Sequence, residues 1–272
     1  MRWNMMTDID WDKFDPGRVD PEILKTVKAA ALVEANAPDY VAYLSGIWAD
    51  APGMIAALDM WGREESQHGA ALAKWAALAD PSFDFDTSLA RFREIQGIDT
   101  EAASSIRGSR TNELIARCVV ESGTSSLYAA IRDKTDEPVL KQLAARIAAD
   151  EFAHYGMFLK QAGDEPVQPG LATRLRVAFG RLFEASDDEL AGAYYCANYG
   201  PDSATRYDRS TFSNAYQKRV LGIYQRRHID RLIAMISKAA GLDPGRALVR
   251  GLQGLAWRVL MWRKRQLVKL AY

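Results

Sequence analysis

The sequence predicts an all-α fold, in which a four-helix bundle is followed by additional C-terminal helices. Helix-forming residues dominate the chain, and alternating runs of β-branched residues are absent. Apolar residues recur in steps of three and four, which is the period of a helix that buries one face. The chain has 272 residues and is 48% hydrophobic, enough to bury one large core, so we expect a single domain over residues 1–272.

Composition excludes several classes of protein. Lys+Arg and Asp+Glu balance at 35 each, so no overall positive charge indicates a nucleic-acid partner. The two cysteines, Cys118 and Cys196, lie far apart and form no CxxC motif, which disfavours a disulfide framework and a thiolate metal site. No apolar run suits a signal peptide or a bilayer-spanning helix. We therefore expect a cytoplasmic protein that is not an integral membrane protein.

The first bundle helix is expected to begin near Pro21, with Asp20 as its N-cap. Proline is tolerated in the first turn because its missing N–H had no helical partner there. The apolar stripe of this helix continues to Trp48. Pro38 removes the hydrogen bond to the carbonyl of Glu34, four residues earlier, so a kink is predicted at this glutamate.

Three more bundle helices follow the same period. The second is expected to begin near Pro52, and a longer connection over roughly residues 79–110 separates it from the third. The third carries its apolar stripe over 114–128, and the fourth begins after Asp136 and ends near Gly163. The bundle therefore occupies about residues 20–164. Beyond it, the pattern predicts further helices over about 171–184, 210–240 and 246–270, with a loop at 198–202.

Each bundle helix carries a glutamate in the middle of its apolar stripe, where leucine would be expected. Two of these glutamates are followed three residues later by a histidine, so a carboxylate and an imidazole share one helical face. The six residues are Glu34, Glu65, His68, Glu121, Glu151 and His154. Burying four carboxylates together is costly unless cations lie among them. The sequence therefore predicts two metal ions bound by these six side chains.

A single Glu-x-x-His motif is weak evidence, because exposed helix faces often carry it. Here two of only three histidines lie in this motif, and the third, His228, is expected to be structural. The spacing also repeats, since Glu34 precedes Glu65 by 31 residues and Glu121 precedes Glu151 by 30. This is the ligand pattern of the ferritin-like di-iron carboxylate bundles. Carboxylate and imidazole donors suit iron or manganese better than zinc, and we expect iron.

Two more acids and one tryptophan are expected around the metal ligands. Metal-bound imidazoles usually donate their other N–H to a carboxylate. Glu64 and Asp150 each immediately precede a ligand glutamate, and we hypothesise that Asp150 reaches His68 while Glu64 reaches His154. The alternative is that either residue is a surface acid. Trp61 is expected in the wall or core beside the site.

At these residues the chain resembles the soluble acyl-ACP desaturases. The resemblance covers roughly residues 30–160 and lies in four segments: Glu-Ala-Asn-Ala-Pro-Asp-Tyr from Glu34, Trp-Gly-Arg-Glu-Glu-Ser-Gln-His-Gly from Trp61, Glu-Ser-Gly-Thr from Glu121, and Ala-Ala-Asp-Glu-Phe-Ala-His from Ala148. The family's segments read Glu-Glu-Ala-Leu-Pro-Thr-Tyr, Trp-Thr-Ala-Glu-Glu-Asn-Arg-His-Gly, Glu-Arg-Ala-Thr and Ala-Ala-Asp-Glu-Lys-Arg-His. Residues 165–272 do not align with the family, so the substrate is left open.

The resemblance implies an oxidoreductase that introduces a double bond into a fatty acyl chain carried on acyl carrier protein or CoA. It implies two iron ions, O₂ as co-substrate, a ferredoxin-type electron donor and a homodimer. It also makes Thr124 a candidate catalytic residue that handles protons or orders water near bound oxygen. The alternative for Thr124 is a small residue chosen for helix packing.

Acyl carrier protein and ferredoxin are both acidic, so a basic docking face is expected. The end of the chain offers one, because Asp243 is the only acid after residue 230. The basic and aromatic residues there are Arg258, Arg263, Lys264, Arg265, Lys269, Trp257 and Trp262. The alternative is that these cations simply stabilise the C-terminal end of a helix.

The same six ligands are compatible with other functions. One is a di-iron oxygenase that hydroxylates or N-oxidises another apolar substrate. Another is ferritin-like or rubrerythrin-like iron storage or peroxide scavenging, which the additional residues 165–272 and the lack of a cysteine-bound iron disfavour. The last is a metal-free helical scaffold, which would leave four buried carboxylates without compensation.

Overall fold

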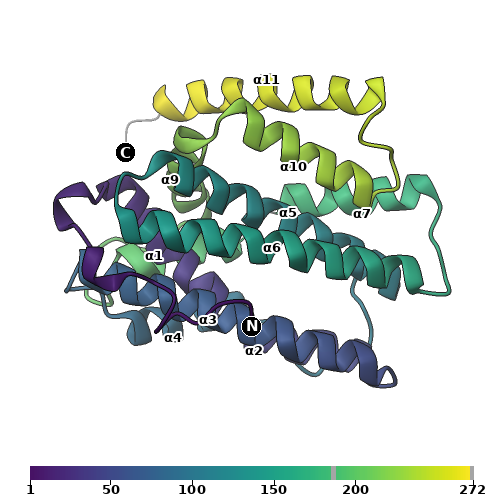
Figure 1. Cartoon of the computed structure of the whole chain (residues 1–272), viewed down its shortest axis with the longest axis horizontal. Helices are drawn as coiled ribbons and strands as arrows, with labels where there is room; N and C mark the ends of the chain where they lie inside the picture. Colours follow the sequence, from purple (N-terminus) through teal and green to yellow (C-terminus); the bar gives the residue numbers. More distant parts are fainter. Residues whose placement is uncertain (185–187, 270–272) are drawn as a thin grey trace. The chain divides into compact units, whose positions relative to one another are not determined.

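The computed structural model describes residues 1–184 and 188–269, and within these ranges the chain is helical and contains no strand. The all-α prediction is therefore confirmed (Figure 1). None of the described helices is apolar over enough residues to cross a membrane. The helices are η1 (Trp11–Lys13), η2 (Pro16–Arg18), α1 (Pro21–Ala35), α2 (Ala37–Ile47), α3 (Pro52–Ala79), α4 (Phe85–Gln96), α5 (Arg110–Lys134), α6 (Pro138–Asp164), α7 (Leu171–Glu184), α8 (Asp188–Asn198), α9 (Arg209–Ile223), α10 (Arg226–Ala239) and α11 (Ala247–Lys269).

Helix α1 begins as the sequence predicts, but the single helix expected to continue to Trp48 is two helices, α1 and α2. Pro21 occupies its first position, and the Asp20 carboxylate accepts hydrogen bonds from two backbone N–H groups of the first turn. The helix ends at Ala35, and α2 starts two residues later. Pro38 lies in the first turn of α2 and has no N–H for the Glu34 carbonyl. The predicted kink is therefore present as a helix break beside this glutamate.

The connection predicted over residues 79–110 contains a helix, α4, which the sequence pattern did not reveal. Asp84 caps its start, because the carboxylate accepts a hydrogen bond from the backbone N–H of Thr87 at 3.0 Å. Gly97 ends it in the left-handed conformation with φ of 56°, which glycine adopts without a steric cost. Helix α8 was likewise not predicted as a separate element.

The helix predicted over 210–240 is two helices, α9 and α10. Gln225 caps the start of α10, and its backbone N–H donates to Nδ1 of His228 at 3.1 Å. The Gln225 side chain in turn accepts from the backbone N–H three residues on, so the two residues form a reciprocal capping box. The structural role expected for His228 is therefore confirmed.

The described chain divides into two compact units. The first holds α1 to α4, α8, the end of α5, the start of α6 and most of α9. The second holds most of α5 and α6 together with α7, α10 and α11. The helices predicted to follow the bundle are thus shared between both units. A single domain over 1–272 stays a prediction.

In the first unit, α1 packs closely against α3. A Cβ atom on Gly69 would lie only 2.6 Å from the backbone nitrogen of Ala35, so this close approach requires glycine. Ala35 follows Glu34 and Gly69 follows His68, which places the close approach beside two predicted ligands. Helix α8 packs against both α1 and α4.

In the second unit, α5, α7 and α10 share a hydrophobic core. Ile115 and Val119 of α5 pack with Val177 of α7 and Ile236 of α10. The hydroxyl of Tyr155 on α6 donates to the backbone carbonyl of Met235 on α10 at 2.8 Å. This bond fastens α6, which carries two predicted ligands, to α10.

Candidate metal centre

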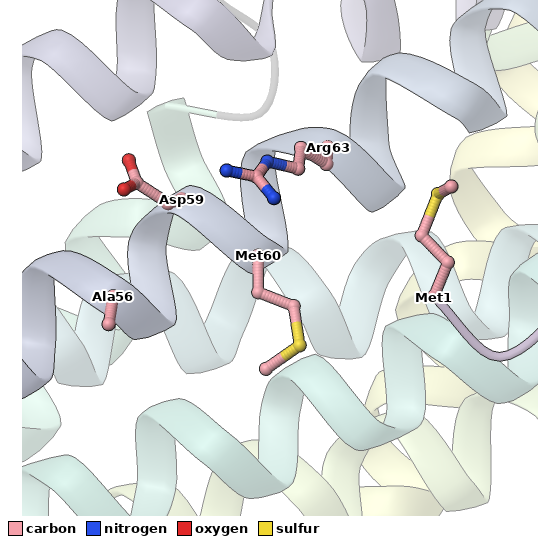
Figure 2. Close-up of a pocket in the computed structure, with 5 residues that line it drawn as sticks. All are labelled: Met1, Ala56, Asp59, Met60 and Arg63. Atoms are coloured by element: carbon pink, nitrogen blue, oxygen red, sulfur yellow. The ribbon is translucent and has the colours of Figure 1, made fainter.

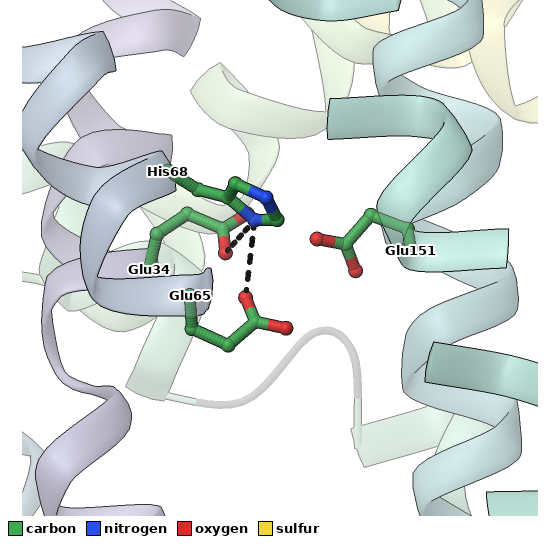
Figure 3. Close-up of side chains that lie close together, drawn as sticks. All are labelled: Glu34, Glu65, His68 and Glu151. Carbon is green, nitrogen blue, oxygen red and sulfur yellow. Dashed lines mark ion pairs between the residues drawn. The ribbon is translucent and has the colours of Figure 1, made fainter. Parts of the chain in front are cut away.

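Three of the six predicted ligands meet inside the first unit. Helix α1 supplies Glu34, and α3 supplies Glu65 and His68 (Figure 3). Nδ1 of His68 lies 3.9 Å from Oε2 of Glu34 and 3.6 Å from Oε2 of Glu65. The His68 side chain is fully buried and the two carboxylates are 5% and 6% exposed. We call these three residues the first triad.

The other three predicted ligands meet inside the second unit. Helix α5 supplies Glu121, and α6 supplies Glu151 and His154. Nδ1 of His154 lies 3.7 Å from Oε2 of Glu121, and all three side chains are buried. We call these residues the second triad. It repeats the composition of the first, with one glutamate from one helix and Glu-x-x-His from a later helix.

The separations within each triad suit metal ligands. Nitrogen–oxygen distances of 3.6 to 3.9 Å are too long for hydrogen bonds. Two donor atoms that each lie about 2.1 Å from one ion are about 3 to 4 Å apart. In each triad, every residue offers one donor atom, and these atoms lie within 4.8 Å of one another. The donors are carboxylate and imidazole, so the residues present fit an ion such as iron or manganese.

Cys118 lies on α5 one turn before Glu121 but does not add a thiolate to the second triad. The side chain is fully buried, and its Sγ faces the backbone carbonyl of Tyr155 at 3.9 Å. Burial raises the pKa of the Cys118 thiol, and the charge of Glu121 raises it further. The thiol therefore stays protonated and behaves as a small apolar group.

Thr124 forms a hydrogen bond with a predicted ligand. Its hydroxyl oxygen lies 2.6 Å from Oε2 of Glu151, and 3.2 Å and 3.3 Å from two backbone carbonyls of its own helix. The hydroxyl has one proton, and the shortest contact identifies Glu151 as its acceptor. Thr124 therefore positions this carboxylate. The catalytic role that the resemblance implies for Thr124 stays a prediction.

The residues expected around the ligands are buried. Glu64 and Asp150 are 7% and 2% exposed, so the alternative that they are surface acids is wrong. Trp61 is buried on α3, as predicted. The hydrogen bonds hypothesised between these acids and the histidines of the triads stay predictions.

The N-terminal segment contributes a residue that sequence analysis missed. The Trp3 indole stacks on His68 with ring centres 6.0 Å apart and an interplanar angle of 9°. Gln67, the neighbour of His68, holds this segment by donating to the Trp3 carbonyl at 3.1 Å and accepting from the Met5 N–H at 3.2 Å. Trp3 lies outside any helical pattern, so no sequence signal connects it to the first triad.

A buried tyrosine of α9 also lies in the electrostatic environment of the first triad. Burial raises the pKa of Tyr216, and the charges of Glu34 and Glu189 raise it further. The Tyr216 phenol is therefore neutral. Glu189 in turn accepts a hydrogen bond from the Tyr40 hydroxyl at 2.5 Å. Both Tyr216 and Glu189 belong to residues 165–272, which do not align with the desaturase family, and this is why they were missed.

A surface pocket of about 410 Å³ lies on α3, away from the side chains of the first triad. Figure 2 shows Ala56, Asp59, Met60 and Arg63 of α3 in its lining, with Met1 of the N-terminal segment opposite. Met60 is 54% exposed, so the pocket is open to solvent. Its lining includes none of the six predicted ligands.

The fold and the site together define an all-helical protein with buried glutamate–histidine groups that could hold metal ions. Comparison with known proteins finds no family model, no curated protein and no solved structure that matches the chain. The ferritin-like arrangement, the iron and the resemblance to acyl-ACP desaturases stay predictions from the sequence.

Proposed function

We propose that the two triads bind a pair of iron ions and that the protein is an O₂-dependent acyl desaturase. One observation carries the proposal: the same buried ligand set, a glutamate beside a Glu-x-x-His motif, occurs once in each unit at donor distances that suit a metal. Such a duplication has no role in packing, where apolar residues would be more stable.

Charge balance supports a pair of divalent ions. Each triad buries two carboxylates and one imidazole, so the six residues together carry four negative charges when the histidines are neutral. Two divalent ions carry four positive charges and would neutralise the set. Histidine binds a metal through a neutral nitrogen, so the imidazoles add donors without changing this balance. A single ion would leave half of the negative charge uncompensated.

The iron pair would supply, with O₂, an oxidant able to remove hydrogen from an unactivated methylene, which no side chain achieves. The overall reaction consumes one O₂, two electrons from a donor and two protons, and yields a double bond and two waters. The protein's part is to exclude water and to fix the ligands. Thr124 fixes Glu151 by its hydrogen bond, and Trp3 covers one face of His68.

The resemblance supports a proposal for the class of substrate. We propose a fatty acyl chain on acyl carrier protein or CoA, a ferredoxin-type electron donor, a homodimer and a cytoplasmic location. The same six ligands are compatible with several oxygen-dependent reactions. The product that forms therefore distinguishes among these reactions.

The test begins with metal binding and ends with product analysis. The purified protein is titrated anaerobically with iron(II), and two ions per chain are expected. The loaded protein, whose iron(II) supplies the two electrons of one turnover, is then given stearoyl- or palmitoyl-ACP and O₂, and its lipid products are identified by mass spectrometry. An unsaturated product supports the proposal. Glu151→Gln should abolish it, whereas Glu101→Gln, at an exposed acid outside the triads, should not.

Other outcomes would contradict the proposal. A hydroxylated or N-oxidised product would establish an oxygenase instead. Consumption of peroxide with the lipid unchanged would establish scavenging or storage. Failure to bind iron, manganese or cobalt at micromolar concentration would contradict both the desaturase and the oxygenase function.

A further inference from the structure

Helix α11 leaves a row of large apolar side chains uncovered. Their spacing of seven, four and three residues places them on one face of the helix. On another face, Val249 and Leu267 are fully buried and hold the helix to the second unit. Figure 1 shows α11 beside α10, against which it packs. The uncovered row consists of Leu248, Leu255, Val259 and Trp262, which are 59%, 56%, 52% and 59% exposed.

Positive charge runs along the edge of this row. Arg258 and Arg265 each follow a member of the row by three residues, and Lys269 ends the helix; all three are exposed. No acidic residue occurs from position 244 to position 269. The face therefore carries apolar and cationic side chains, with Gln266 as a neutral polar residue one turn after Trp262, over about 30 Å of helix at 1.5 Å per residue. We call it the α11 face.

Exposed apolar rows of this size usually mark an interaction surface. A second copy of the chain is a poor occupant, because like charges would meet along the whole row. An acidic protein would match the cations but needs a groove as long as the helix to cover the apolar row. An anionic bilayer provides both features at once, since negative headgroups lie directly above apolar chains.

We propose that the α11 face binds lengthwise to the surface of an anionic phospholipid bilayer. The apolar row would enter the boundary between headgroups and acyl chains, and the three cations would lie among the phosphates. Trp262 is well suited to this boundary, where tryptophan is enriched because its ring is apolar and its N–H is polar. Helix α11 would lie on the membrane and not cross it. This proposal does not depend on metal binding or on the proposed reaction.

The test measures co-sedimentation of the full-length protein with vesicles of 30% phosphatidylglycerol in phosphatidylcholine, against vesicles of phosphatidylcholine alone. Binding to the anionic vesicles is expected, weakening as salt is raised. The triple variant Arg258→Gln/Arg265→Gln/Lys269→Gln should lower the binding constant about a hundredfold. Its control, Lys134→Gln/Lys141→Gln/Lys160→Gln, removes the same charge from exposed positions elsewhere and should change it much less.

The apolar row is tested separately. Leu255→Gln/Val259→Gln/Trp262→Gln should reduce vesicle binding by about tenfold or more, because the apolar burial is lost. Leu78→Gln, at an exposed leucine of α3, is the control. All of these positions are exposed, so the variants are expected to fold, which circular dichroism would verify. Lipids brominated on the acyl chain should quench the fluorescence of wild-type protein more than that of the Trp262→Phe variant.

Three results would overturn the proposal. One is a lack of binding to anionic vesicles at low salt. Another is a complex with acyl carrier protein that the same two triple variants abolish while vesicle binding is weak, which would make the α11 face a protein-docking surface. The third is a dimer that dissociates on substitution of the apolar row, measured by light scattering.

Discussion

Thr124 illustrates how a small side chain can fix the geometry of a buried ligand. A carboxylate in an apolar helix interior can rotate, and each metal-binding geometry needs one rotamer. The 2.6 Å hydrogen bond from Thr124 selects one for Glu151 from a position one turn after Glu121. Partners of this kind usually change metal affinity when they are removed.

Replacing Thr124 with valine keeps the volume and deletes the hydroxyl. If the second triad binds a metal, Thr124→Val should weaken that binding about 10- to 100-fold, measured by anaerobic titration with cobalt(II) or iron(II). The matched control is Ser122→Ala on the same helix, whose buried hydroxyl donates to the backbone carbonyl of Cys118 at 2.6 Å and not to a ligand carboxylate. Equal affinities in wild type and Thr124→Val would show that the hydrogen bond has no influence on the metal.

The sequence reveals some residues of the candidate site and hides others. A glutamate on an apolar stripe is visible without coordinates, because it breaks a pattern that packing explains. Trp3 and Tyr216 break no pattern, since an aromatic residue is ordinary in a core. Their proximity to the first triad results from tertiary packing, which local spacing does not encode.

At the scale of helices, prolines and acidic caps predicted the helix boundaries better than the apolar stripes did. The starts of α1 and α3 and the break beside Glu34 follow from Pro21, Pro52 and Pro38. Helix α4 was missed because it buries little more than Ser88 and Phe92 and so shows no long stripe. Helix α8 contains a glycine in its middle, which lowers helix propensity.

Gly192 of α8 and Gly69 of α3 both allow a neighbouring element to pack closely. In both, the missing Cβ lets another element approach: Ile95 lies 3.0 Å from the Cβ position of Gly192, and the Ala35 backbone lies 2.6 Å from that of Gly69. Backbone atoms yield less than a flexible side chain does. The α1–α3 approach beside the first triad is therefore the more sensitive of the two.

Gly69→Ala should force α1 and α3 apart. We expect a loss of about 1 to 3 kcal/mol in the free energy of unfolding, measured by urea denaturation in the presence of a chelator. Metal affinity should fall as well, because Glu34 and His68 flank the contact. Gly53→Ala lies in the same helix, where an added Cβ meets nothing within 4 Å, and should leave stability nearly unchanged. Equal unfolding curves for wild type and Gly69→Ala would contradict the close approach.

At the scale of the whole molecule, the repeat in the sequence is matched by a repeat in the structure. The Glu34–Glu65 and Glu121–Glu151 spacings differ by one residue, and each unit contains one pair together with its histidine. The sequence could predict this duplication because it resides in local spacing. It could not predict that the C-terminal helices are divided between the units, since a helix's own pattern does not specify its packing partner.

Whether six ligands form one centre or two is a question of energetic coupling. Glu65→Gln and Glu151→Gln each remove one carboxylate, the first from the first triad and the second from the other. If both triads share a pair of ions, each single variant should weaken the binding of both ions. The double variant should then lose less than the sum of the single losses, with a coupling of about 1 kcal/mol or more.

Independent triads would behave differently. Each single variant would keep one ion at wild-type affinity, and the losses would add within about 0.5 kcal/mol. Titration with manganese(II), followed by calorimetry, gives both the number of ions bound and the affinities. Pairing Glu65→Gln with Glu101→Gln, an exposed acid outside the triads, provides the additive reference. Additive losses for Glu65→Gln and Glu151→Gln would rule out a shared iron pair even if both triads bind metal. When two ions share ligands, removing one carboxylate must change the binding affinity of both ions.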